Sequence, residues 1–135
     1  MQDITREDFV SALICGIVAR GEPIEGWHFL GKCGYAAAHA AFERLRQEEG
    51  LDLRFLIILD RTYSDSPVWC EAVAWAAGGN LICRSEPGER DFRIIVGSEA
   101  AQMILANLPG DPKVWERVVE VYVNTHHKVF AGASA

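Results

Sequence analysis

Cys33 is the residue whose type and position most suggest chemistry, because it lies next to Lys32 at the expected start of a helix. The positive end of the helix macrodipole and the Lys32 charge would both lower the pKa of its thiol and favour the nucleophilic thiolate. A hydrolase or acyl transferase built on this thiol needs a histidine as general base. His39 lies about 240° around the same helix. Of the histidines downstream of Cys33, only His126 or His127 could therefore serve, and only if the fold brings one of them to Cys33. The alternative is a structural cysteine beside a glycine turn.

Loop 60–66, with the sequence DRTYSDS, is the second candidate site. It runs from the end of an expected strand to the start of an expected helix, where open α/β sheets bind their ligands. The loop contains no glycine, which excludes the Walker and dinucleotide-binding fingerprints. It would suit a small ligand or metabolite, or its residues could simply form turns and cap the helix. The candidate ligand-binding residues are Asp60, Arg61, Ser64, Asp65 and Ser66.

The histidine and cysteine spacings do not favour a metal site. His28, Cys33 and His39 are separated by four and five residues, and His126 and His127 are adjacent. Neither spacing matches the compact pairs that place two ligands on one ion. We therefore expect no metal and no cofactor.

Residues 67–77, with the sequence PVWCEAVAWAA, form the most unusual segment. Helical periodicity places Trp69 and Trp75 roughly 120° apart, and only Glu71 is charged, so this helix has no ordinary solvated face. A small domain cannot easily bury a helix on all sides. We therefore expect a protein interface that contains Trp69, Trp75 and Trp27, with a homodimer as its simplest form. The alternative is a helix packed between the sheet and another helix.

The composition describes one soluble, acidic domain over residues 1–135. Half of the residues are apolar, and 13 Lys and Arg stand against 19 Asp and Glu, for a net charge of −6. This charge argues against nucleic acid and anionic membranes as partners. No apolar run approaches the roughly 18 residues of a membrane span, and we expect no signal peptide. Four cysteines without a CxxC pair, three of them within apolar segments, indicate a reducing cytoplasm.

The first half of the chain predicts two helices and a strand. Thr5 and Asp8 resemble a capping box, and apolar residues then repeat at helical spacing until Gly21. A second helix is expected over about 34–49, after a short strand or irregular segment at 27–30. The apolar run 53–59 predicts a central strand covered on both faces.

The second half predicts three helices and a hairpin. Ser66 and Pro67 begin a helix that ends at Ala77. Strands at 81–84 and 91–96 should form an antiparallel hairpin around a turn at 85–89. A helix follows over 98–106, with Ser98 as its expected N-cap, and another from Asp111-Pro112 onward, although 118–123 could instead be a strand with its turn at 124–128.

Together these elements predict an α/β or α+β single domain with about five helices and one small mixed sheet. The sheet should have three to four strands and contain one βαβ unit, formed by 53–59, the helix 67–77 and 81–84. The favoured function is that of a small cytoplasmic interaction protein, self-associating or binding a protein partner as inhibitors and immunity proteins do. The alternatives are the thiol-dependent enzyme and the small-ligand protein described above.

Overall fold

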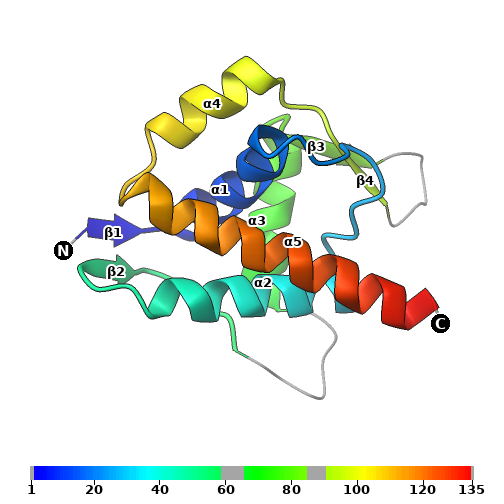
Figure 1. The fold of residues 1–135 in the computed structure, drawn as a ribbon, viewed down its shortest axis with the longest axis horizontal. Helices are drawn as coiled ribbons and strands as arrows, with labels where there is room; N and C mark the ends of the chain where they lie inside the picture. Colours follow the sequence, from blue (N-terminus) through cyan, green and yellow to red (C-terminus); the bar gives the residue numbers. More distant parts are fainter. Residues whose placement is uncertain (1, 59–65, 85–90, 135) are drawn as a thin grey trace.

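The computed structural model describes residues 2–58, 66–84 and 91–134, and these form a mixed α/β structure with five helices and two small sheets (Figure 1). The helices are α1 (Arg6–Ala19), α2 (Gly31–Arg46), α3 (Pro67–Gly78), α4 (Ser98–Ala106) and α5 (Pro112–Ser134). The strands are β1 (Gln2–Ile4), β2 (Leu51–Leu53), β3 (Ile82–Arg84) and β4 (Phe92–Ile94). Every helix in the described ranges is too short or too polar to cross a membrane.

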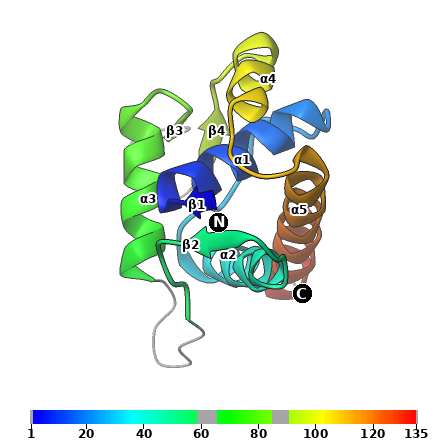
Figure 2. The same ribbon diagram turned by 90° about the vertical axis from the view of Figure 1, so that its left-hand side faces the viewer.

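The centre of the fold is α1. The predicted capping box is confirmed, because the Thr5 hydroxyl accepts a hydrogen bond from the Asp8 amide while the Asp8 carboxylate accepts one from the Thr5 amide. All side chains from Phe9 to Ile17 are buried. In Figure 2, α3 lies on one side of α1 and α5 on the other, with α4 above them. The hydrophobic core therefore surrounds this helix.

Helices α3, α4 and α5 begin within one residue of their predicted starts, and α3 and α4 also end within one residue of their predicted ends. Ser66 is the N-cap of α3 and Pro67 is its first residue, as predicted. Helix α4 spans 98–106, although Gly97 and not Ser98 is its N-cap. Residues 112–134 form one helix, so the alternative strand at 118–123 is wrong. Burial at helical spacing explains this outcome, because Val118, Val119, Tyr122 and Val123 all face the core.

Helix α2 begins at Gly31 and ends at Arg46, three residues earlier at each end than the sequence predicted. Its N-cap, Leu30, makes no side-chain cap hydrogen bond. The start is fixed by packing instead. A Cβ atom at Gly34 would lie 1.8 Å from the Phe29 carbonyl oxygen, so only glycine allows this approach. Tertiary contact thus sets a boundary that capping rules could not locate.

The prediction of one mixed sheet with a βαβ unit is wrong. Instead, β2 pairs in parallel with β1, with Gln2 opposite Leu51 and Ile4 opposite Leu53. Among the described residues, strand β3 pairs only with β4, in the antiparallel hairpin that was predicted. Its turn at 85–89 lies outside the described residues.

The expected central strand at 53–59 is replaced by a short strand and a segment without regular secondary structure. Strand β2 ends at Leu53, and residues 54–58 belong to no strand, whereas residue 59 is outside the described ranges. Leu56 and Ile58 are more than half exposed, so the run is not covered on both faces. The expected strand or irregular entry at 27–30 contributes one isolated bridge, between Trp27 and Phe92.

Candidate functional site

One side of α3 is exposed and almost entirely nonpolar. Residues at helical spacing on one face make up this surface, which we call the outer face of α3: Pro67, Glu71, Ala74, Trp75 and Gly78. Figure 2 shows α3 at the edge of the molecule, with α1 on its inner side. Trp75 is 47% exposed, which is unusual for so large an aromatic side chain. The outer face of α3 is the candidate docking surface.

The inner face of α3 belongs to the core. Trp69 is fully buried, its indole N–H donates to the Phe29 carbonyl at 2.6 Å, and its ring packs against Phe9 and Tyr122. Trp27 is 2% exposed, and its indole N–H donates to the Pro23 carbonyl at 2.7 Å. These hydrogen bonds satisfy the one polar atom of each ring.

The expectation that Trp69 and Trp27 line an interface is therefore corrected, because both are core residues of a single chain. Of the three tryptophans expected at an interface, only Trp75 is accessible to a partner. Periodicity identified a helix without a solvated face, but it could not say which of its two tryptophans faces inward.

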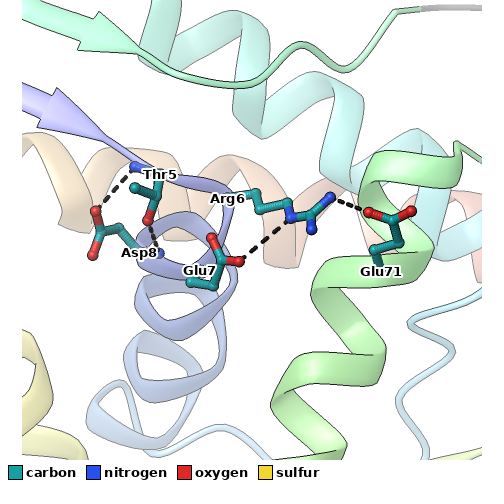
Figure 3. A network of polar contacts seen from close by, with 5 residues as sticks. All are labelled: Thr5, Arg6, Glu7, Asp8 and Glu71. Carbon is teal, nitrogen blue, oxygen red and sulfur yellow. Dashed lines mark hydrogen bonds and ion pairs between the residues drawn. The ribbon is translucent and has the colours of Figure 1, made fainter.

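Glu71 is the only charged residue of α3, and α1 supplies its partner. The Arg6 guanidinium forms an ion pair with Glu71 and lies 3.4 Å from the Glu7 carboxylate. Figure 3 shows Arg6 reaching across from the first turn of α1 to α3. This contact ties the two helices together and places a paired positive and negative charge beside the apolar part of the outer face.

Cys33 lies in the first turn of α2 and is buried, 8% exposed. Burial raises the pKa of its thiol, and the nearby Lys32 charge offsets this only in part. The expectation of a lowered pKa is thus corrected. Among the described residues, no hydrogen bond joins this thiol to a histidine. None of the four cysteines, all of which are described, forms a disulfide.

The two histidines proposed as general bases have different surroundings. His127 is exposed, whereas His126 is 2% exposed and packs against Trp27 with ring centroids 4.7 Å apart. The Nε2 atom of His126 accepts a hydrogen bond from the His28 amide at 3.0 Å. Burial, followed by the nearby His127 and His28, lowers the pKa of His126 to about 4. A general base would need the lone pair on Nε2 of His126, and this lone pair already accepts the hydrogen bond from the His28 amide.

Sequence reasoning missed the contact of His28 with these residues. Besides donating its amide to His126, His28 places its Nε2 atom 2.8 Å from the Asp91 carboxylate. No sequence spacing links residues 28, 91 and 126, so only the fold reveals this group. Within the described ranges, no cluster of three His, Cys, Asp or Glu side chains could hold a metal ion.

Most of the candidate ligand loop falls outside the described residues, namely Asp60, Arg61, Ser64 and Asp65. Ser66 is described, and its hydroxyl accepts a hydrogen bond from the Trp69 amide at 3.5 Å. For Ser66, this is the capping role that the sequence offered as the alternative to ligand binding.

Comparisons with protein-family models, with curated proteins and with solved structures gave no match for this chain.

Proposed function

We propose that this protein acts by protein–protein interaction, that the outer face of α3 is its docking surface, and that a second copy of the chain occupies it. One observation carries the proposal. On this surface, an exposed tryptophan stands beside small residues on a helix with a single charged residue. Tryptophan is strongly enriched among the residues that dominate binding energy at interfaces.

Hydrophobic burial supplies the driving force. About half of the Trp75 side chain is exposed, and covering it would remove on the order of 120 Å² from water, worth about 3 kcal/mol for each copy. Ala74 and Gly78 have little or no side chain, so a partner helix could approach the backbone of α3 closely. The outer face therefore combines a large anchor with a shallow surface on which a helix can lie.

Symmetry favours a second copy as the occupant. In a twofold dimer the same patch meets itself, so a self-complementary surface is required. Arg6 and Glu71 provide one charge of each sign at the edge of the outer face. In a twofold dimer, each copy would therefore present one positive and one negative charge to the other.

One face of a helix of this length offers less area than the roughly 800 Å² that each partner buries in a standard interface. Neighbouring residues must therefore contribute to the docking surface. Ile95 is one of them, because it is 39% exposed and its amide donates to the carbonyl of Leu81, just beyond the C-terminal end of α3.

Sedimentation velocity over a wide range of protein concentration tests the proposal. We expect the wild type to shift from monomer to dimer as concentration rises. Trp75→Glu should remain monomeric, because it places a charge at the centre of the interface. Met103→Glu is the matched control, since Met103 is a large, 63% exposed apolar residue on α4 and should leave the dimer intact.

A wild type that stays monomeric at every concentration contradicts the second copy as occupant. If Met103→Glu abolishes the dimer as strongly as Trp75→Glu, then general surface hydrophobicity causes the association and the outer face of α3 has no special role.

A further inference from the structure

A groove lies between the first half of α1 and the C-terminal end of α4. Its volume is about 380 Å³, within the range of small-molecule sites. The polar residues that line it are Asp8 and Ser11 of α1 and Asn107 at the end of α4, and the apolar ones include Ile104 and Leu108. We call it the α1/α4 groove.

The hydroxyl of Ser11 is the feature that points to a ligand. Ser11 is only 6% exposed, yet among the described residues its hydroxyl has no hydrogen-bond partner. Buried polar groups are nearly always hydrogen-bonded, and an unpaired one lowers stability. Alanine is also the better helix former at an interior position such as this one. Because a hydroxyl here costs stability within the chain, its position in the groove indicates a hydrogen-bond partner from outside.

Two further polar side chains border the groove with free acceptor atoms. Asp8 lies one helical turn before Ser11, and one of its carboxylate oxygens accepts a hydrogen bond from the Thr5 amide at 3.0 Å. Within the described ranges, the other oxygen forms no hydrogen bond or ion pair. The side-chain nitrogen of Asn107 donates to a backbone carbonyl of α4 at 2.8 Å, which leaves its oxygen as an acceptor. Asp8 is the only charged residue among the described residues that line the groove.

We propose that the α1/α4 groove binds a small alcohol with an apolar body. The ligand hydroxyl would donate to the Asp8 carboxylate and accept from the Ser11 hydroxyl, so that both groups gain a partner. An ammonium group only donates and would give the Ser11 proton no acceptor, whereas a carboxylate only accepts and would be repelled by Asp8. The apolar body would pack against Ile104 and Leu108, which are both partly buried.

Four probes that share one phenyl ring test this proposal: benzyl alcohol, toluene, benzylammonium and benzoate. Binding is followed at pH 7 by proton–nitrogen NMR spectra of the full chain, with the backbone amide of Ser11 and the side-chain amide of Asn107 as local reporters. We expect saturable binding of benzyl alcohol with the largest shifts at these two reporters. Toluene, benzylammonium and benzoate should each bind more weakly.

The variant Ser11→Ala separates ligand binding from a structural role. It should weaken the binding of benzyl alcohol roughly 5- to 10-fold, the worth of one hydrogen bond, and leave that of toluene unchanged. Without ligand, its midpoint of urea unfolding should rise, because alanine removes the unpaired hydroxyl. Ser98→Ala makes the same substitution at an exposed position of α4 outside the groove and should leave the affinity for benzyl alcohol unchanged.

Several results would overturn the proposal. On the ligand side, these are the absence of saturable binding, an affinity for toluene or benzylammonium that equals or exceeds that for benzyl alcohol, and shifts that leave the two reporters unaffected. On the protein side, they are full affinity for benzyl alcohol in Ser11→Ala and a urea midpoint of this variant that does not rise, since the hydroxyl would then have a structural role.

Discussion

Protonation of His126 should destabilise the fold as the pH falls. Its Nε2 atom accepts the His28 amide hydrogen, so a proton on Nε2 would break that hydrogen bond and bury a positive charge. Two further histidine rings lie nearby, those of His28 and His127, and the Asp91 carboxylate lies 2.8 Å from the Nε2 atom of His28. In the neutral ring the hydrogen is on Nδ1, which has no hydrogen-bond partner among the described residues. The folded state therefore strongly favours neutral His126.

The size of the effect follows from the pKa of His126, which is about 4 in the folded chain against an ordinary value of 6.5. Between these two pH values the unfolded chain binds one proton more than the folded chain. The free energy of unfolding should then fall by about 1.4 kcal/mol for each pH unit, or about 3 kcal/mol in total. This stability is complete above pH 6.5 and is lost as the pH drops towards 4.

Urea unfolding measured at several pH values between 7 and 4 tests this reasoning. His126→Gln keeps an oxygen that can accept the His28 amide but removes the titrating ring, so its stability should depend much less on pH than that of the wild type. His39→Gln, on α2, retains His126 and should keep the wild-type slope. Equal slopes for His126→Gln and the wild type would refute the account of His126 as a buried neutral ring.

The remaining predictions concern the core and the helix ends. Gly34→Ala should destabilise the fold by more than about 2 kcal/mol in urea unfolding, because its Cβ atom would collide with the Phe29 carbonyl, whereas Gly132→Ala, with open space around it, should be neutral or slightly stabilising. Thr5→Ala should cost about 1 kcal/mol in the same assay through loss of the capping box. Cys33 should react with iodoacetamide more slowly in the folded chain than in the urea-unfolded chain; faster reaction in the folded chain would restore it as a candidate nucleophile.

The starts of two helices could be predicted from the residues at the helix ends. The start of α1 follows from Thr5 and Asp8, and that of α3 from Ser66 and Pro67, because these residues satisfy or avoid the free amides of a helix end. The β3–β4 hairpin was also found, since two short apolar runs flank a polar turn.

The sheet was not predictable in the same way, because strand pairing depends on contacts between distant residues. Strand β1 has only three residues, two of them polar, and gives no periodic signal of its own. Its partner β2 was obscured by the apolar run that follows it, which looked like one long buried strand. The run also contains Leu56 and Ile58, and sequence alone could not reveal that both are more than half exposed.

The candidate surface could be predicted only in part. The scarcity of charged residues in 67–77 indicated a helix without an ordinary solvated face. In the structure, the exposed apolar side of this helix lies around Trp75. The direction of Trp69 and the burial of Cys33 depend on which elements pack beside them, which no local pattern encodes.

The most direct test of the central claim is the accessibility of Trp75 as a function of protein concentration. The other three tryptophans, Trp27, Trp69 and Trp115, are at most 3% exposed, so iodide in solution should quench the fluorescence of Trp75 almost alone. If a second copy covers the outer face of α3, the quenchable fraction should be present in dilute protein and disappear as the dimer forms. A quenchable fraction that is the same at every concentration would contradict the proposal.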